Sequence, residues 1–170
     1  MILTGSEIYK EVMKGNIYLE PFSRDQLNPN TYNYRLGETL KKFTYFDGEK
    51  SIFSTIKIPN NGYLLSSGQM YLGQTMEIIG SKKYTTSLIG KSSLGRLGLF
   101  LQLSANLGHT GIKHQWTLEL YAALPIIIYP KMIIGQVSFW TNYGDVSPYS
   151  GEYGKFSIPQ ESILFNHNAL

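Results

Sequence analysis

The chain has 170 residues, enough for one domain with a hydrophobic core, and its 42% hydrophobic and 16% charged residues are typical of a globular protein. The net charge of +3 suits an anionic small molecule but is too small for a nucleic-acid-binding surface. The absence of cysteine excludes disulfides, thiol chemistry and zinc sites built on cysteine, and the three histidines predict no metal site. We find neither a signal peptide nor a run of transmembrane length, so the sequence predicts a cytoplasmic protein without a membrane contact.

The N-terminal segment predicts one short helix. Thr4 and Glu7 have the spacing of a capping box, and apolar residues then recur at helical spacing. Gly15 is a suitable stop, which gives a helix over roughly residues 5–14. Short strands are expected to follow over residues 16–20 and 32–36.

From residue 40 onward the sequence predicts short strands and tight turns. Asp47-Gly48 and Asn61-Gly62 are signals for hairpins. The other predicted strands are apolar or alternating runs: 70–79, 85–89, 97–103, 116–122, 126–129 and 133–140. This pattern favours a mainly β fold, a barrel or a sandwich, in a single domain over residues 1–170. Residues 141–170 are rich in Gly, Tyr, Pro and Ser and are predicted to be a mobile C-terminal tail.

A single carboxylate interrupts the apolar run 116–120. In an extended strand Leu118 and Leu120 share one face, whereas Thr117 and Glu119 share the other. The more frequent meaning of this pattern is a solvated glutamate on the outer face of an amphipathic strand. The functional alternative is a carboxylate in a pocket, where it acts as a general acid or base.

Residues 90–98, Gly-Lys-Ser-Ser-Leu-Gly-Arg-Leu-Gly, combine glycines, paired hydroxyls and two cations. Such a loop can hold phosphate through Lys91 and Ser93, with Arg96 paired to an acid. It is not a Walker loop, because Thr85 stands where that motif has its first glycine. The alternative is an ordinary polar turn between two strands.

Other candidate residues lie in the loop 104–111, on one strand and in the tail. His109 can titrate near neutral pH, and its loop can face a base. Gln136 can bond the amide edge of a ligand or a neighbouring backbone group. Tyr149 and Lys155 can close over a bound nucleotide. A surface histidine and a disordered tail are the plainer alternatives.

Several of these segments resemble the dCTP deaminases, relatives of the trimeric dUTPases. Residues 90–99 resemble their G-R-S-S-L-x-R-L-G-L motif, residues 117–120 their catalytic T/V-L-E segment, and residues 133–136 their I-G-Q strand. The N-terminal pattern and residues 28–37 are also similar, so the resemblance covers nearly the whole chain. It implies a dUTPase-like distorted β-barrel or jelly roll with a short N-terminal helix.

The resemblance implies hydrolytic deamination of dCTP, or of a modified deoxycytidine nucleotide, to dUTP and ammonia without a protein-bound metal. Glu119 would move the protons, and Arg96 would orient it. Ser92 and the backbone carbonyl of Ala105 would hold the attacking water. The residues expected to contact the nucleotide are Lys91, Ser93, Asn106, His109, Gln136, Tyr149 and Lys155. Mg²⁺ would arrive with the phosphates, and the homotrimers of this family place their sites at subunit interfaces.

Some residues depart from the family pattern. Lys91 replaces an arginine, Asn33 an aspartate, and Asn106 part of a His-Arg or Ala-Gly pair. His109 stands where relatives have the aspartate that activates water for triphosphate hydrolysis, which argues against dUTPase or bifunctional activity. Two alternatives stay open: a nucleoside triphosphate pyrophosphatase in which His109 activates water, and a nucleotide-binding member that has lost catalysis.

Overall fold

A computed structural model describes residues 1–163, and the last part of the predicted tail, residues 164–170, lies outside the described residues. The predicted mainly β architecture with one short N-terminal helix is confirmed. No helix within residues 1–163 is long and apolar enough to cross a membrane. The elements in chain order are α1 (Gly5–Met13), β1 (Ile17–Glu20), η1 (Arg24–Gln26), β2 (Tyr32–Arg35), β3 (Thr39–Phe46), β4 (Ser51–Lys57), β5 (Tyr63–Leu65), β6 (Gln69–Ser81), β7 (Tyr84–Gly90), α2 (Ser92–Gly95), β8 (Leu99–Leu101), β9 (Leu107–Gly108), β10 (Lys113–Ala122), β11 (Ile126–Ile128), β12 (Ile133–Thr141) and η2 (Glu152–Lys155).

The helix α1 begins and ends at the predicted signals. The hydroxyl of Thr4 accepts a hydrogen bond from the backbone N–H of Glu7 (3.4 Å), and Gly15 follows the helix with a φ of +71°. Glu11 on the buried face accepts hydrogen bonds from Asn16 (2.9 Å) and from the Tyr84 hydroxyl (2.9 Å). These contacts fix α1 against β7.

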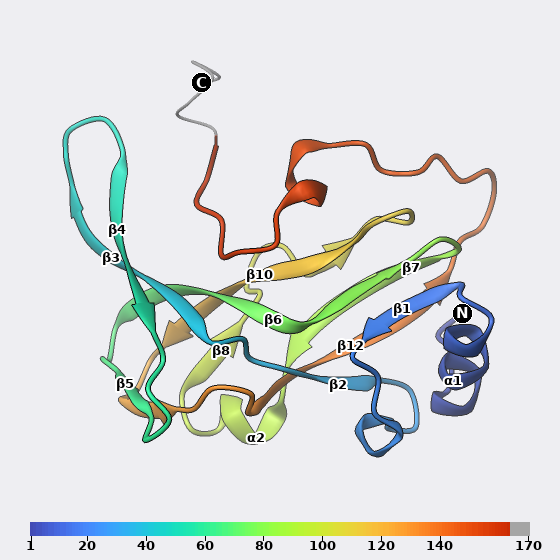
Figure 1. Ribbon diagram of the computed structural model, residues 1–170, viewed down its shortest axis with the longest axis horizontal. Coiled ribbons are helices and arrows are strands. Elements are labelled where there is room, and N and C mark those ends of the chain that lie inside the picture. Colours follow the sequence, from blue (N-terminus) through green and yellow to red (C-terminus); the bar gives the residue numbers. More distant parts are fainter. Residues whose placement is uncertain (164–170) are drawn as a thin grey trace.

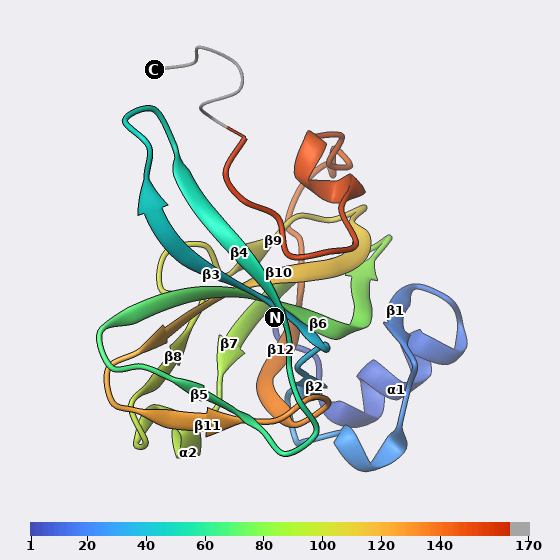
Figure 2. The same cartoon turned by 60° about the vertical axis from the view of Figure 1, so that its left-hand side comes forward.

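Three sheets make up the body of the molecule (Figures 1 and 2). The largest has the strand order β4-β3-β6-β10-β8, with β1 paired to β6, and the second has the order β2-β12-β7-β9. β5 and β11 form a small third sheet. The strand orders are open, so residues 1–163 form packed sheets and no closed barrel.

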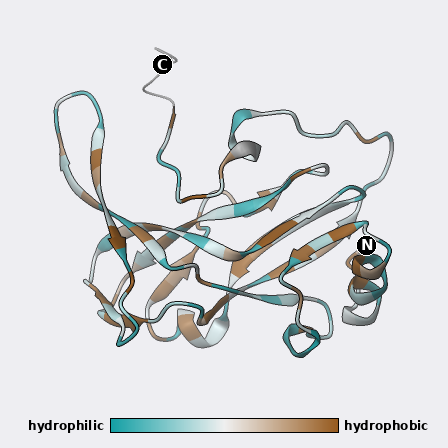
Figure 3. Cartoon of the chain, viewed as in Figure 1, coloured by the Kyte–Doolittle hydropathy of each residue, from teal (hydrophilic) through white to brown (hydrophobic). Residues whose placement is uncertain are grey.

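The core is formed mainly by side chains from the two larger sheets. Among its largest fully buried members are Tyr32 and Tyr34 on β2, Tyr71 on β6 and Phe139 on β12. Figure 3 shows apolar segments alternating with hydrophilic ones along these strands, as expected when only one face of a strand is buried. Packing of the two sheets therefore leaves the other face of β10 available to line a site.

Two local predictions were wrong. Asn61-Gly62 forms a turn in which the Gly62 N–H bonds to the Pro59 carbonyl, but the flanking strands β4 and β5 belong to different sheets and make no hairpin. The predicted loop after Gly90 contains the single helical turn α2, because the N–H groups of Gly95 and Arg96 bond back to Lys91 and Ser92. Asp47-Gly48, in contrast, does join the β3–β4 hairpin, as predicted.

The described part of the tail, residues 142–163, crosses the molecule toward β10 and the β3–β4 hairpin (Figure 1). The Tyr149 N–H bonds to the Thr110 carbonyl (3.0 Å), and the Gln160 N–H bonds to the Thr117 hydroxyl (3.0 Å). Glu161 forms an ion pair with Lys41 on β3 (2.8 Å). The tail thus follows a defined course in this structure, and its mobility stays a prediction.

Candidate active site

A cavity of about 690 Å³ lies between β10, the loop 102–109, the β3–β4 hairpin and the tail. Its volume is in the range of sites that hold small molecules such as nucleotides. Gly108 brings the loop close to the sheet, because a Cβ at this position would collide with the Thr86 hydroxyl and the Trp116 ring. Glycine at this position thus permits the close approach of the loop to β7 and β10 beside the cavity.

Glu119 projects from β10 into this cavity. The neighbouring Leu118 and Leu120 are fully buried on the opposite face, while Thr117 and Glu119 are half-buried and line the cavity. The Ser104 hydroxyl donates a hydrogen bond to Glu119 Oε2 (3.2 Å). The structure thus favours the pocket carboxylate over the solvated outer-face glutamate.

Gln102 links the two backbone groups on either side of the carboxylate. Its side-chain carbonyl accepts the N–H of Glu119 (2.7 Å), and its amide nitrogen donates to the Ala105 carbonyl (3.0 Å). The sequence analysis missed both Gln102 and Ser104. The available signal for Gln102 was its polar side chain inside the apolar run 97–103.

Among the described residues, His109 and His114 line the cavity, and each imidazole is stacked on an aromatic ring. His109 stacks on Tyr149 of the tail, with ring centroids 5.2 Å apart, and His114 stacks on Trp116 at 4.8 Å. His114 Nδ1 lies 2.7 Å from the Gln115 carbonyl, which only accepts, so Nδ1 carries the proton and Nε2 is left as an acceptor. Burial lowers the pKa of His114, an effect that this hydrogen bond partly offsets.

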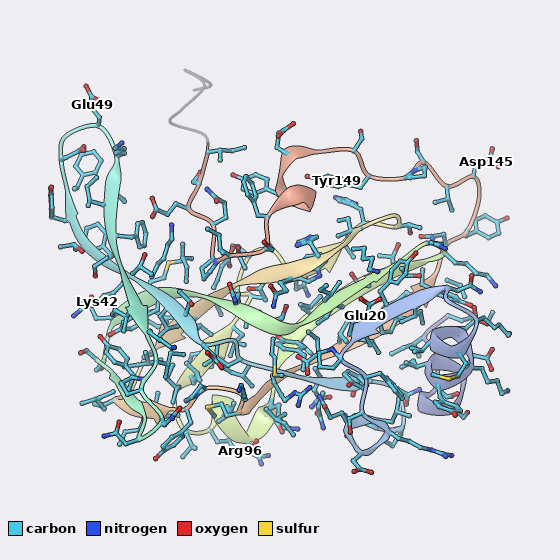
Figure 4. The ribbon with its side chains drawn as sticks, viewed as in Figure 1. Glu20, Lys42, Glu49, Arg96, Asp145 and Tyr149 are labelled. Carbon is cyan, nitrogen blue, oxygen red and sulfur yellow. The ribbon has the colours of Figure 1, made fainter. Side chains whose placement is uncertain are left out.

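The predicted water-binding, phosphate-binding and Glu119-orienting residues of the loop 90–98 lie on another side of the molecule. Ser92, Ser93 and Arg96 are exposed on and beside α2, and Figure 4 shows Arg96 on the opposite side from Tyr149. Within one chain the expected contact between Arg96 and Glu119 therefore does not form, because the body of the molecule separates them. Whether these residues act together in an assembly stays a prediction.

Lys91 and Gln136 also lie away from the cavity, in a polar cluster on β2, β7 and β12. Lys91 Nζ donates to the Asn33 side-chain carbonyl (3.0 Å). The Thr31 hydroxyl donates to the side-chain carbonyl of Gln136 (2.8 Å), which lies opposite Asn33 in the strand register. These residues are placed together with the α2 group and not with Glu119.

Of the remaining predicted site residues, some line the cavity and others do not. Ala105, His109 and Tyr149 line the cavity with Glu119. Asn106 is exposed and does not line it, and its backbone carbonyl accepts the Leu88 N–H (2.8 Å). The side chain of Lys155 lies outside the described residues. Among the described residues that line the cavity, Lys50 on the β3–β4 hairpin is the one lysine or arginine, a cation that the sequence analysis did not single out.

Residues 1–163 contain no group of three or more His, Asp or Glu side chains placed to hold a metal ion.

The fold matches a known structure. It is similar to the crystal structure of 2′-deoxycytidine 5′-triphosphate deaminase from Agrobacterium tumefaciens, with a TM-score of 0.68 and 20% sequence identity. The match covers 83% of this chain and 48% of the other, so this chain spans about half the length of that one. At this identity the likeness establishes the fold alone, and it confirms the predicted dUTPase-like class.

Sequence comparison then gives the family. A profile described as dCTP deaminase-like matches residues 2–142, so the chain belongs to that family. The chain is 41% identical to "dCTP deaminase, dUMP-forming" of Hathewaya histolytica over 97% of this chain and 98% of the relative. It is 40% identical to the protein of the same name from Leptospira biflexa, over 97% of both chains. The prediction of a hydrolase of this family is confirmed.

The expected product, dUTP, is wrong, because these relatives are named for the formation of dUMP. The expectation of dUTP rests on His109, which stands where relatives have the aspartate that activates water for triphosphate hydrolysis. An imidazole is itself a proton acceptor near neutral pH, so the exchange of aspartate for histidine does not remove the chemical capacity to activate water.

Proposed function

We propose that the protein converts dCTP to dUMP, releasing ammonia and pyrophosphate and consuming two molecules of water. The observation that carries the proposal is one cavity lined by Glu119, the Ala105 backbone and His109 in a chain whose relatives are dUMP-forming dCTP deaminases. We also propose a cytoplasmic location, which a deoxynucleoside triphosphate substrate supports.

In the deamination step Glu119 takes a proton from the water that attacks C4 of the cytosine ring and delivers it to N3 of the ring. The same carboxyl group then takes the proton of the new C4 hydroxyl and delivers it to the amino group, so that the C4–N bond breaks, ammonia leaves and the C4 carbonyl forms. The Ala105 carbonyl, held by Gln102, accepts the second hydrogen of the water. The Ser104 hydroxyl keeps one oxygen of Glu119 in place while the other faces the cavity.

In the second step water attacks the α-phosphorus, and the bond to the β-phosphate oxygen breaks to give dUMP and pyrophosphate. We assign His109 as the base, since its ring lies at the wall of the cavity under Tyr149. Lys50 supplies positive charge, and Mg²⁺ held by the phosphates would screen the developing charge on the leaving group.

The active form is proposed to be a homotrimer in which α2 of a second copy completes the cavity. The support is twofold. Ser92, Ser93 and Arg96 are exposed on the side away from Glu119, and apolar side chains beside them, Leu97 and Phe100, are 56% and 40% exposed. Contact with another copy would cover these side chains and bring the hydroxyls and the cation to the carboxylate.

The test is incubation of the purified protein with dCTP and Mg²⁺, with nucleotides separated by ion exchange and ammonia and pyrophosphate assayed. The expected result is one ammonia and one pyrophosphate for each dUMP. Accumulation of dCMP would overturn the deamination step, and accumulation of dUTP alone would overturn the hydrolysis step.

Variants of the two histidines test the assignment of the second base. His109→Asn should still release ammonia but should accumulate dUTP, whereas His114→Asn should still yield dUMP. The opposite pattern, with dUTP from the His114 variant, would move the role of base to His114, whose Nε2 is also an acceptor in the cavity.

A further inference from the structure

Gln102 has a backbone conformation that its residue type disfavours. It follows β8 directly and has a φ of +51°, in the left-handed region that glycine adopts most easily. It is also 8% exposed, although its side chain is polar. Within residues 1–163, Lys131 is the only other non-glycine residue with a positive φ. A strained and buried polar residue beside a catalytic cavity needs a compensating interaction.

That compensation is a set of hydrogen bonds that extends the ladder between β8 and β10. The last paired residues are Leu101 and Leu120, after which the chain turns away from β10. The Gln102 N–H then bonds to the Glu119 carbonyl (3.1 Å), and its side-chain carbonyl accepts the Glu119 N–H (2.7 Å). One residue thus supplies both partners of Glu119, where a strand would normally use two backbone groups.

The amide nitrogen of the same side chain extends the connection to the loop. It donates to the Ala105 carbonyl (3.0 Å), so that one planar amide spans the Glu119 backbone and the Ala105 backbone. The bond also uses one lone pair of that carbonyl and leaves the other for water. The relative position of the carboxylate and the water-binding carbonyl is therefore set by a single side chain.

We propose that Gln102 is the positioning residue of the deamination step, holding Glu119 and the Ala105 carbonyl at the separation that the attacking water requires. The inference rests on the proposed function, and it goes beyond it by assigning a role to a residue that does not itself exchange a proton. We expect substitution of Gln102 to lower turnover more than nucleotide binding. Misplacement of the reacting groups by a fraction of an ångström reduces stabilisation of the transition state more than it reduces binding of the substrate.

The simpler alternative is that Gln102 only turns the chain. The two explanations differ in what glycine would do. If the residue only turns the chain, Gln102→Gly should keep full activity, since glycine adopts a positive φ without strain. If the side chain positions the site, Gln102→Gly should lower kcat although the fold is retained.

The experiment compares wild type, Gln102→Gly and a matched control, Lys131→Gly. Lys131 also has a positive φ (64°), but it is an exposed turn residue paired with Glu38. We expect Gln102→Gly to lower kcat for ammonia release from dCTP by about 100-fold, with KM within about threefold of wild type. Thermal unfolding of both variants should stay close to that of wild type, and Lys131→Gly should keep its kcat.

A second variant, Gln102→Glu, tests the hydrogen bond to Ala105 separately from the one to Glu119. It keeps the acceptor for the Glu119 N–H but replaces the donor to Ala105 with a negative charge. The charge disfavours ionisation of Glu119, so the acidic limb of kcat/KM should move to higher pH. A pH profile that coincides with that of wild type would count against the proposal.

The outcomes separate the two levels of the argument. Equal kcat values for wild type and Gln102→Gly would overturn the positioning role and leave the proposed function intact. Absence of ammonia release by wild type would overturn the proposed function itself. A fall in kcat with an unchanged fold and a nearly unchanged KM, together with the shifted pH profile, would establish the positioning role.

Discussion

At the scale of the residue, the proposed deamination depends on the carboxylate of Glu119. Glu119→Gln keeps the size of the side chain and the hydrogen bond from Ser104 but removes the group that we propose to move protons. We expect kcat for ammonia release to fall by about 10²–10⁴-fold, the range that general acid–base catalysis supplies, with dCTP binding largely retained. Steady-state kinetics and calorimetric titration with dCTP measure the two quantities.

A control for this substitution is Glu20→Gln, which also neutralises a carboxylate, but on β1 in an exposed ion pair with Lys113. It should keep wild-type kinetics. Turnover by the Glu119 variant at the wild-type rate would remove Glu119 from the mechanism and return it to the role of a solvated strand residue.

The sequence identified Glu119 and Ala105 as candidate site residues but did not identify Gln102 and Ser104. Glu119 could be found because an acid in an apolar strand stands out, and Ala105 followed from the family motif. Gln102 and Ser104 could not be found in the same way. A polar residue in the apolar run 97–103 marks Gln102 as unusual, but its role and that of Ser104 arise from a left-handed backbone turn and from the reach of a side chain to another strand, which a local pattern does not reveal.

At the scale of the element, α1 is held by a buried carboxylate whose ionisation should make stability depend on pH. Hydrogen bonds from Lys14, Asn16 and Tyr84 lower the pKa of Glu11 from 4.5 to about 2. Because the folded pKa is depressed, this stabilisation is present above the unfolded pKa and is lost as the pH falls from about 4.5 toward 2.

We therefore expect Glu11→Gln to destabilise the protein by about 1–2 kcal/mol at pH 7, and by progressively less below about pH 4.5. Urea unfolding at several pH values measures this difference. Glu7→Gln is the matched control on the same helix, since its pair with Lys10 is exposed and should contribute little. A difference between Glu11→Gln and wild type that stays constant from pH 7 to about pH 2 would contradict the explanation.

The tail is a second element whose contacts can be tested. Glu161 and Lys41 form a half-buried ion pair that holds the tail against β3 at the cavity. Glu161→Gln should raise KM for dCTP by about two- to fivefold, the equivalent of a weak ion pair, and make the tail easier to cleave by proteases. Lys10→Met, which breaks an exposed pair on α1, should do neither. Unchanged KM and cleavage in the Glu161 variant would show that this pair does not hold the tail.

Element prediction succeeded where the signal is local. The apolar or alternating runs 116–122 and 133–140 predicted most of β10 and β12, and Asp47-Gly48 predicted the β3–β4 hairpin. It failed at Asn61-Gly62, because a turn signal does not reveal whether the strands that follow pair with each other or enter different sheets. That choice is made by packing between distant segments, as when β5 pairs with β11.

At the scale of the whole molecule, the residues that the sequence predicts to form one site lie on two different sides of the folded chain. Glu119 and Ala105 line the cavity, whereas Ser92 and Arg96 lie on and beside α2 on the other side (Figure 4). Sequence order cannot reveal this division, since the two segments are close in the chain and both belong to the family motif. A closed ring of copies would join the two halves at every interface.

This arrangement makes a specific prediction about mixed assemblies. Glu119→Gln lacks the proton carrier, and Ser92→Ala lacks a hydroxyl from the opposite half of the site, so each variant alone should be nearly inactive. In a ring assembled at random from equal amounts of both, about a quarter of the interfaces should combine an intact Glu119 with an intact Ser92. Co-expression should therefore restore about a quarter of wild-type ammonia release, with a trimeric mass by sedimentation. If each chain instead carried a complete site, no interface could repair either defect, and the mixture would stay as inactive as its components.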